Sequence, residues 1–287
     1  MRLATIMLEG RPRPAVVRDD DTVVPIDTRT TGLAGIRAIA AGGPAAFDRL
    51  VAWLDAQPLD AGLPLSTVSL GPAVPDPGAI YTVGHNYDDP AAADGPAAAP
   101  RPDRPLIYGK AARAVAGHGA TLAWDRAVTD DVDAEVELAV VIGAPAFRVA
   151  PENALGHVFG YTIIDDVSAR DEQLDGDQWL LGKSMPGFCP VGPWIVTADA
   201  FDPTDVALGC RIDGEPIQED RTSRMRFPIA EIVSYLSRHL ELRPGDLIAT
   251  GTPVRLASPP GPGRRLRPGD TVTAWIEGIG ELTTPIA

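Results

Sequence analysis

The chain contains three acidic residues whose spacing within apolar segments could form a functional site: Glu135, Glu137 and Asp166. The first two lie in D-V-D-A-E-V-E-L-A-V-V-I-G (131–143), whose aliphatic and β-branched residues predict a strand. Side chains two positions apart project from the same face of a strand, so Glu135 and Glu137 point the same way. Asp166 ends a second strand-like run, V-F-G-Y-T-I-I-D-D (158–166).

Like charges placed side by side on an apolar strand repel one another, and burying them without compensation is costly. A divalent cation held by oxygen ligands supplies that compensation, and three carboxylates with water molecules suit Mg²⁺, Mn²⁺ or Ca²⁺. The alternative is a strand whose acidic side chains face solvent. The Glu-x-Glu pattern by itself does not exclude this alternative.

A second group of polar residues follows Asp166 directly. The segment V-S-A-R-D-E-Q (167–173) predicts the start of a helix with Ser168 as its N-cap. Arg170 and Gln173 are three positions apart and share a helix face, from which they could grip a substrate carboxylate or carbonyl. Both could equally be ordinary exposed residues of a surface helix.

Two further segments place single polar groups among Gly and Pro. Lys183, in L-L-G-K-S-M-P-G-F-C-P-V-G-P-W (180–194), could stabilise negative charge on a substrate oxygen, or it could extend to solvent like most lysines. Gly251 and Thr252, in L-R-P-G-D-L-I-A-T-G-T-P (242–253), come at the end of a predicted strand. A backbone N–H and a hydroxyl there can bind an anionic oxygen, although G-T-P alone predicts only a turn.

The 287-residue chain is acidic, since 25 Lys and Arg against 39 Asp and Glu give a formal net charge of −14. This charge argues against nucleic acid and anionic membranes as partners. No stretch approaches the roughly 18 apolar residues of a membrane span, and the N-terminus lacks the pattern of a signal peptide, so we expect a cytoplasmic protein. Cys189 and Cys210 have no Cys-x-x-Cys spacing and predict neither a disulfide framework nor a zinc site.

The elements that must hold these residues fall into two parts. Before the Pro- and Gly-rich linker at 71–78, residues 2–8 and 14–26 predict short strands broken by Gly10, Pro12 and a turn at 19–21. Two helices are predicted at 33–39 and 47–54. This pattern predicts a small α/β N-terminal domain, residues 1–72, and a larger domain, residues 73–287.

The larger part is rich in short strands separated by Gly and Pro. Strands are predicted over 79–84, 134–143, 157–166, 192–197, 205–213, 246–250 and 270–277. One helix is predicted at 228–240, where the apolar residues form a single stripe. The expected fold class is therefore α+β and β-dominated, nearer a roll or barrel than a doubly wound sheet. The Ala- and Pro-rich segment 88–105 predicts a surface loop or lid.

Taken in order, these segments resemble the fumarylacetoacetate hydrolase family. The matching pieces include Y-T-V-G-H-N-Y, D-A-E-V-E-L-A-V-V-I-G, G-Y-T-I-I-D-D-V-S-A-R-D-E-Q, G-K-S-M-P-G-F-C-P-V-G-P-W, L-R-P-G-D-L-I-A-T-G-T-P and I-E-G-I-G-E-L, from about Ile80 to the end of the chain. The resemblance implies a mixed β-sandwich roll as the catalytic domain, a small α/β domain before it, and a homodimer.

For the site, the resemblance implies Mg²⁺, with Mn²⁺ or Ca²⁺ as alternatives, on the three carboxylates. The family's substrate-contacting positions correspond here to Tyr87, Arg170, Gln173, Lys183, Gly251 and Thr252. Family members act on 2-oxo acids, often 2,4-diketo acids of the acylpyruvate type. The metal polarises the 2-oxo group, and Lys183, with Arg170 and Gln173 beside it, is placed to stabilise the resulting enolate. We therefore expect hydrolytic C–C cleavage or decarboxylation first.

The chain departs from the family on the predicted lid. Hydrolytic and decarboxylating relatives follow N-Y with x-x-His-x-x-Glu, a pair that activates water. The corresponding residues here are Pro90 and Ala93, and neither can move a proton. The family's Lys-Ser-x-Asp turn also becomes Lys-Ser-Met-Pro at residues 183–186 and loses a carboxylate.

Three hypotheses stay open. In the first, another group replaces the missing base, with His85 as the catalytic candidate and Asp88 and Asp89 as its acidic neighbours. In the second, the enzyme is an isomerase, tautomerase or hydro-lyase, which needs no hydrolytic water. In the third, the chain is a non-catalytic binding protein on the same scaffold, a hypothesis against which the retained metal and substrate residues weigh. We interpret His118 and His157 as structural or exposed histidines.

Overall fold

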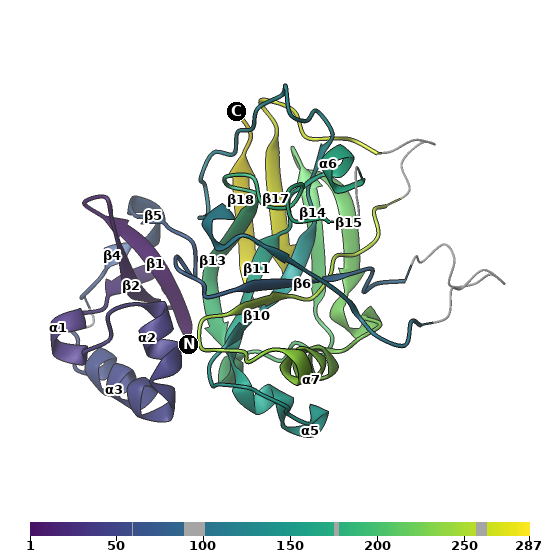
Figure 1. Cartoon of the computed structure of the whole chain (residues 1–287). Coiled ribbons are helices and arrows are strands. Elements are labelled where there is room, and N and C mark those ends of the chain that lie inside the picture. Colours follow the sequence, from purple (N-terminus) through teal and green to yellow (C-terminus); the bar gives the residue numbers. More distant parts are fainter. Residues whose placement is uncertain (59, 89–100, 175–177, 257–262) are drawn as a thin grey trace.

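The computed structural model describes residues 1–58, 60–88, 101–174, 178–256 and 263–287. Two large β-sheets dominate these residues, with helices at their margins (Figure 1). Most strand pairs are antiparallel, whereas β16 pairs with β6 and β13 with β8 in parallel. The predicted β-dominated α+β class with a mixed sheet is thereby confirmed. No helix among the described residues is long and apolar enough to cross a membrane.

Short strands make up most of the regular structure. The strands are β1 (Arg2–Leu8), β2 (Arg11–Val17), β3 (Thr22–Pro25), β4 (Leu63–Pro64), β5 (Ser69–Leu70), β6 (Ile80–Gly84), β7 (Leu106–Lys110), β8 (Val115–Ala116), β9 (Val132–Asp133), β10 (Val136–Ile142), β11 (Val158–Asp165), β12 (Ser168–Ala169), β13 (Cys189–Thr197), β14 (Ala207–Ile212), β15 (Glu215–Arg221), β16 (Leu247–Ala249), β17 (Thr271–Ile276) and β18 (Gly280–Pro285). The α-helices are α1 (Thr28–Thr31), α2 (Ile36–Ala41), α3 (Gly43–Asp55), α5 (Pro151–Ala154), α6 (Arg170–Leu174) and α7 (Ile229–His239).

The larger sheet runs from the N-terminal part into the rest of the molecule. Its strand order is β4-β3-β2-β1-β13-β11-β10-β16-β6-β7, so β1 is hydrogen-bonded to β13. In sequence the two parts are joined by residues 71–78, which have no regular structure. The division of the chain into domains at residue 72 stays a prediction.

The second sheet, ordered β15-β14-β17-β18, packs on one face of the larger sheet. Val136 and Leu138, which alternate with Glu137 along β10, are completely buried in the core between the sheets. Ile232 of α7 is buried in the same core, because the apolar residues of this helix recur at helical spacing on one face. The alternation along β10 therefore sends Glu137 to the opposite face of the sheet.

The N-terminal part closes that opposite face. Ala139 and Val141 share the face of β10 with Glu137, and they pack with Ile36 of α2 and Leu50 of α3 in a second core. Each of these four apolar side chains is at most 1% exposed. Glu137 therefore lies beside an apolar layer rather than in solvent, and its charge is costly unless it is compensated.

The predicted strands of the larger part and the helix at 228–240 are confirmed. The turn predicted at 19–21 is also confirmed, since it separates β2 from β3. Strands β7, β15 and β18 are missed. The sequences of β15 and β18, E-P-I-Q-E-D-R and G-E-L-T-T-P, carry few apolar residues, and β7 directly follows the segment predicted as a loop. Most of the predicted lid, residues 89–100, lies outside the described residues.

The prediction of Ser168 as a helix N-cap is wrong. Ser168 belongs to β12, which pairs with β9, and helix α6 begins two residues later at Arg170. The Ser168 side chain accordingly does not cap the helix; it donates hydrogen bonds to the Glu135 carboxylate and to the Asp166 carbonyl. The sequence V-S-A-R-D-E-Q contains the usual cap residue, but strand pairing overrides that local preference.

We predict that Ile232→Ala lowers the free energy of unfolding by about 2–5 kcal/mol, because it leaves a cavity in the core between the sheets. Urea unfolding followed by tryptophan fluorescence measures the change. Arg238→Ala, at an exposed position of the same helix, is the matched control and should have a small effect. Equal losses in the two variants would contradict the packing of α7 described above.

Candidate active site

Several chain segments converge at one end of the larger sheet because of the strand directions. Strand β10 is antiparallel to both β11 and β16, so the start of β10 lies beside the ends of the other two. This arrangement brings Glu135 and Glu137 next to Asp166 and next to the loop at 250–256. Strand β6 is parallel to β16, which adds the residues that follow Gly84.

The three carboxylates predicted to bind a metal lie together and are buried. One oxygen from each of Glu135, Glu137 and Asp166 lies within 4.8 Å of the others. The exposed fractions of these residues are 7%, 1% and 0%, which excludes the alternative of an acidic strand facing solvent. Clustered carboxylate oxygens of this kind can hold a divalent cation.

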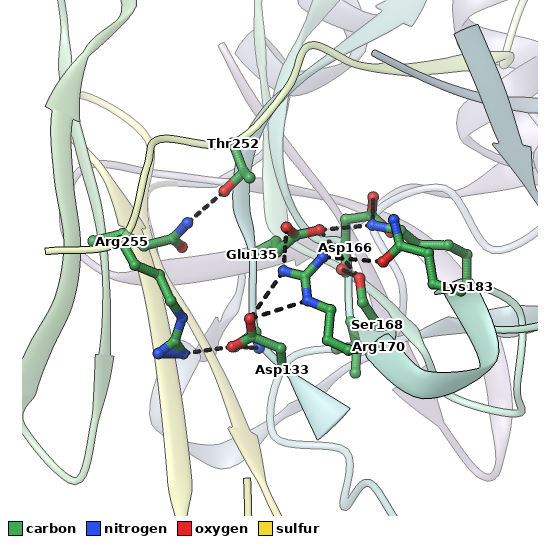
Figure 2. A network of polar contacts seen from close by, with 12 residues as sticks. Asp133, Glu135, Asp166, Ser168, Arg170, Lys183, Thr252 and Arg255 are labelled. Atoms are coloured by element: carbon green, nitrogen blue, oxygen red, sulfur yellow. Dashed lines mark hydrogen bonds and ion pairs between the residues drawn. The ribbon is translucent and has the colours of Figure 1, made fainter. Parts of the chain in front are cut away.

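Two buried lysines and a tyrosine compensate part of this negative charge. Lys183 Nζ donates to Glu135 Oε2 at 2.6 Å and to Asp166 Oδ2 at 2.8 Å (Figure 2). Lys110 Nζ donates to Asp166 Oδ1 at 2.5 Å, and the Tyr108 hydroxyl donates to Asp166 Oδ2 at 2.9 Å. Because Lys183 is 1% exposed, the alternative of a lysine that extends to solvent is excluded.

These ion pairs fix the charge state of the cluster. Although burial opposes ionisation of Asp166, Lys110 and Lys183 hold its pKa below the usual range. Burial also opposes ionisation of Glu135, but Lys183 and Arg170 hold the pKa of this carboxyl below its usual range. Burial disfavours the charged form of Lys183 as well, yet Asp166 and Glu135 raise its pKa. Lys183 is therefore an ammonium group at neutral pH.

Glu137 is compensated less well than its two neighbours. Its Oε2 accepts a hydrogen bond from Gly251 N at 2.7 Å, whereas Oε1 is buried with no hydrogen-bond partner among the described residues. Burial, together with Asp166 and Glu135 nearby, raises the pKa of Glu137 well above its usual range. A divalent cation among the three carboxylates would give Oε1 a partner and add the missing positive charge. The donor set therefore fits the metal that the resemblance implies.

Arg170 and Gln173 lie on one face of α6, and Arg170 is held by protein groups. Its Nη1 donates to Gln173 Oε1 at 3.1 Å. Its Nη2 donates to Asp133 Oδ2 at 2.9 Å and to Glu135 Oε1, and its Nε donates to Asp133 Oδ2 at 3.2 Å. All three guanidinium nitrogens are thereby engaged within the wall of the site.

Gln218 of β15 fixes the loop that follows β16. Its Nε2 donates to Thr252 Oγ1 at 2.7 Å and to Pro253 O at 2.6 Å, and its Oε1 accepts from Val136 N at 3.0 Å. The Thr252 hydroxyl accepts from Gln218, so its own proton remains for another acceptor. Thr252 lines the cavity described below, where a substrate oxygen can be that acceptor.

Gly251 is required by the close approach of two loops. Its φ is 101°, a backbone conformation that favours glycine, and a Cβ at this position would lie 2.5 Å from Asn86 Cβ. The Gly251 N–H, expected to bind a substrate oxygen, donates instead to Glu137. Substrate binding by Gly251 stays a prediction.

Asn86, which is completely buried, ties together three loops around the site. Its Nδ2 donates to Thr250 O at 2.6 Å and to Phe227 O at 3.2 Å, and its Oδ1 accepts from Phe227 N at 2.8 Å. The residues after β6, the loop after β16 and the start of α7 are thus held in one arrangement. Asn86 was missed because an Asn beside a Gly and a His also predicts an ordinary turn.

The neighbours of Asn86 line the cavity. His85 is exposed, and its ring meets that of Trp179 edge-on at a centroid distance of 6.1 Å. Tyr87 is 3% exposed, and its hydroxyl has no hydrogen-bond partner among the described residues. His118 and His157 do not line this cavity. The geometry thus brings His85, but not the other two histidines, to the carboxylates.

Most of these groups line one cavity of about 270 Å³. It is lined by Val83, Gly84, His85, Tyr87, Tyr108, Glu135, Glu137, Arg170, Gln173, Trp179, Lys183, Gln218, Thr252, Pro253, Val254 and Arg255. Pockets for drug-sized ligands start at about 300 Å³, so the cavity suits a small molecule. Asp166 and Gly251 contact the lining residues Lys183 and Glu137 but are not among the lining residues themselves, and neither are Asn86 and Lys110.

Besides Asn86, sequence reasoning missed five further residues that act in this site. They are Asp133, Tyr108, Lys110, Gln218 and Arg255. A period-two signal was available for Asp133, which lies two positions before Glu135 and four before Glu137. The same signal was available for Tyr108 and Lys110, which are two positions apart on β7. For Gln218 and Arg255 no local pattern exists, because their roles depend on contacts between distant strands and loops.

We predict that Glu137→Gln weakens binding of Mg²⁺ or Mn²⁺ by more than about tenfold, since loss of even an outer partner of a metal ligand costs at least that much. Isothermal titration calorimetry measures the affinity. Glu219→Gln, the same change at an exposed position of β15, should bind the metal like the wild type. Unchanged affinity in Glu137→Gln would remove this residue from the metal site.

We also predict that metal affinity falls as pH falls. The pKa of Glu137 is raised, so protons compete with the cation for its carboxylate, and metal binding releases protons. Calorimetry in two buffers of different ionisation enthalpy measures the proton release. A metal affinity independent of pH, with no proton released, would show that Glu137 is already ionised before the metal binds.

Three comparisons place the chain among known proteins. Residues 79–287 match the family model of the fumarylacetoacetate (FAA) hydrolase C-terminal domain. Oxaloacetate tautomerase YisK of Bacillus subtilis (strain 168) is 39% identical over 224 residues, which cover 77% of this chain and 74% of the relative. A solved fumarylacetoacetate hydrolase from psychrophilic Exiguobacterium antarcticum superposes with a TM-score of 0.86 at 33% identity, covering 100% of this chain and 99% of the other.

A maleylpyruvate hydrolase from Sphingobium sp. SYK-6, solved in complex with manganese(II) and pyruvate, superposes with a TM-score of 0.81 at 28% identity. This alignment covers 100% of this chain and 99% of that one. The range matched by the family model, residues 79–287, contains every residue of the site described above. The chain belongs to the fumarylacetoacetate hydrolase family.

Proposed function

We propose that this protein is a metal-dependent tautomerase that interconverts the keto and enol forms of a small 2-oxo acid of the oxaloacetate type. The observation that carries the proposal is the buried Lys183 ammonium on the carboxylate cluster. It offers charge stabilisation at a substrate oxygen, while the water-activating pair of hydrolytic relatives is replaced by Pro90 and Ala93. Tautomerisation needs charge stabilisation at a substrate oxygen, but it does not need a pair of residues that activates water.

Glu135, Glu137 and Asp166 would hold the cation, which we take to be Mg²⁺, with Mn²⁺ or Ca²⁺ as alternatives. When bound, a divalent cation supplies Lewis acidity toward the 2-oxo group of the substrate. The unpartnered Oε1 of Glu137 supports this assignment. The manganese(II) bound by the maleylpyruvate hydrolase relative also supports it.

Lys183 stabilises the oxygen on which negative charge develops. An ammonium group has three N–H donors, of which two are directed to Glu135 and Asp166. The third remains for the C2 oxygen of the substrate. Because the pKa of Lys183 is raised, the group keeps its charge throughout the neutral range, so it serves as an electrostatic stabiliser rather than as a base.

The substrate carboxylate next to the 2-oxo group binds to Thr252 and Gln173. The Thr252 hydroxyl, held by Gln218, donates its proton to a carboxylate oxygen. Gln173 accepts from Arg170 through Oε1, so its amide N–H groups remain to donate to the substrate. Arg170 acts in this proposal mainly by fixing Gln173 and Glu135, because its nitrogens are engaged by the protein.

A proton must also move at substrate C3. His85 lines the cavity and is exposed, so it can exchange protons with solvent, and we assign this step to it. Tyr87 lies on the same wall, where its unpartnered hydroxyl can bind a substrate oxygen. The oligomer implied by the family resemblance, a homodimer, is part of the proposal.

Hydrolytic C–C cleavage or decarboxylation of an acylpyruvate-type acid, which the resemblance first implied, is the second candidate. The names of the hydrolase relatives favour it. It requires a base that activates water, and among the described residues of the cavity His85 would have to take that role. A non-catalytic binding protein is a weaker hypothesis, because Lys183 and the three carboxylates are retained.

We predict that the Mg²⁺-loaded protein accelerates exchange of the C3 protons of oxaloacetate in D₂O, followed by NMR against a protein-free sample containing the same Mg²⁺. Lys183→Met should lower kcat by at least about 100-fold, the usual effect of losing a group that stabilises developing charge. Glu135→Gln and chelation by EDTA should abolish exchange, and Glu219→Gln should leave it unchanged.

The same spectra discriminate the candidates. If cleavage products of oxaloacetate or of an acylpyruvate appear as fast as the C3 protons exchange, the protein is a hydrolase or decarboxylase and the tautomerase proposal is wrong. Exchange no faster than in the protein-free sample, with every 2-oxo acid tried, would leave the binding protein as the remaining hypothesis.

A further inference from the structure

Arg255 occupies a fixed position at the wall of the cavity. Its backbone forms an antiparallel bridge with Gln218 of β15, and the next residue, Leu256, donates its N–H to Ile217 O. The side chain is 21% exposed and lines the cavity. The loop after β16 therefore carries Thr252 and Arg255 on one well-anchored segment, three residues apart.

Arg255 belongs to a group of three arginines gathered around one buried carboxylate. Asp133 is 2% exposed; its Oδ2 pairs with Arg170 at 2.9 Å and its Oδ1 with Arg255 at 2.5 Å. Arg265 lies 3.7 Å from Asp133 Oδ2 and pairs with Asp131. Asp131, Asp133 and Glu135, which Arg170 also contacts, balance the three guanidinium charges at this wall.

The two arginines that line the cavity differ in how far their donors are used. All three nitrogens of Arg170 donate to Asp133, Glu135 or Gln173. Arg255 donates from Nη1 to Arg264 O at 3.1 Å, and its Nη2 forms the ion pair with Asp133 Oδ1 at 2.5 Å. Its Nε is buried with no hydrogen-bond partner among the described residues. Nε and one Nη form the fork with which arginine binds a carboxylate through two parallel bonds.

Arg255 and Lys183 lie at opposite ends of the polar network, with Asp133 and Glu135 between them (Figure 2). A 2-oxo acid whose first carboxylate and carbonyl bind beside the metal-site carboxylates and Lys183 directs its other end away from Lys183. We propose that Arg255 binds a second carboxylate at that other end, so that the enzyme selects 2-oxo dicarboxylates over 2-oxo monocarboxylates. This inference rests on the proposed function of the same cavity.

Two substrates of equal carbon number isolate the effect. Oxaloacetate carries a carboxylate where 2-oxobutyrate carries a methyl group, and C3 exchange in D₂O can be followed for both. In Arg255→Gln we expect kcat/KM for oxaloacetate to fall roughly 10- to 100-fold, mostly through KM, as the loss of a charged hydrogen-bonding pair predicts. The kcat/KM of Arg255→Gln for 2-oxobutyrate should stay within about threefold of the wild-type value, however large or small that wild-type value is. Arg255→Lys should recover part of the loss, because the charge is kept and the fork is not.

A binding measurement separates this inference from the proposed reaction. Calorimetric titration of the Mg²⁺-loaded protein with each acid should show oxaloacetate binding more tightly than 2-oxobutyrate, and Arg255→Gln should remove most of that preference. This result is expected even of a protein that catalyses a different reaction on the bound acid. Arg211→Gln, a change at a partly exposed arginine of β14, is the control and should keep the preference.

Three outcomes would overturn the role of Arg255. Equal losses for both acids in Arg255→Gln would show that this arginine positions Asp133 and Arg170 instead of binding substrate. An unchanged preference for oxaloacetate would place the second carboxylate elsewhere. Equal binding of the two acids by the wild-type protein would show that no group selects a second carboxylate.

Discussion

Burying Glu135, Glu137 and Asp166 with oxygens within 4.8 Å of one another costs free energy that the surrounding residues must offset. Lys183 and Lys110 provide two positive charges, and both lysines are buried for this purpose. Removal of either partner would leave a buried charge without compensation, so the lysines and the carboxylates depend on one another. Positive charge is still missing beside Glu137, whose Oε1 has no hydrogen-bond partner among the described residues. This missing charge favours the binding of a cation by the cluster.

The site divides into a part built on strands and a part built on loops. The carboxylates stand at the ends of β10 and β11, where two cores hold the backbone on both sides. Thr252 and Arg255 stand on a loop that Gln218 and Asn86 fasten to its neighbours. Under the proposed function, the strand ends carry the chemistry common to 2-oxo acids, and the loops recognise the particular acid. This division fits a family whose members share a fold and differ in reaction.

Most of the fold and half of the site could be predicted from the sequence. The alternation along 131–143 predicts the strand and the shared face of Glu135 and Glu137, because both depend only on local geometry. The prediction of Ser168 as a helix N-cap is wrong, because pairing of β12 with β9 overrides the local preference of serine for a cap position. The Gly251 N–H is taken by Glu137, and Arg255 is brought to the cavity by a bridge to β15. Such contacts join residues far apart in the chain, and no local pattern encodes them.

The hydrogen bonds between β1 and β13 have a consequence for how this protein can be dissected. A fragment that begins at residue 73 would expose the edge of β13 at Ile195 and Val196, with its unpaired N–H and C=O groups. It would also uncover the apolar layer that Ile36 and Leu50 cover in the whole chain. An open edge beside a bare apolar surface is a template for aggregation. The first seventy residues thus cover this strand edge and this apolar surface, so residues 73–287 should be expressed and engineered together with them.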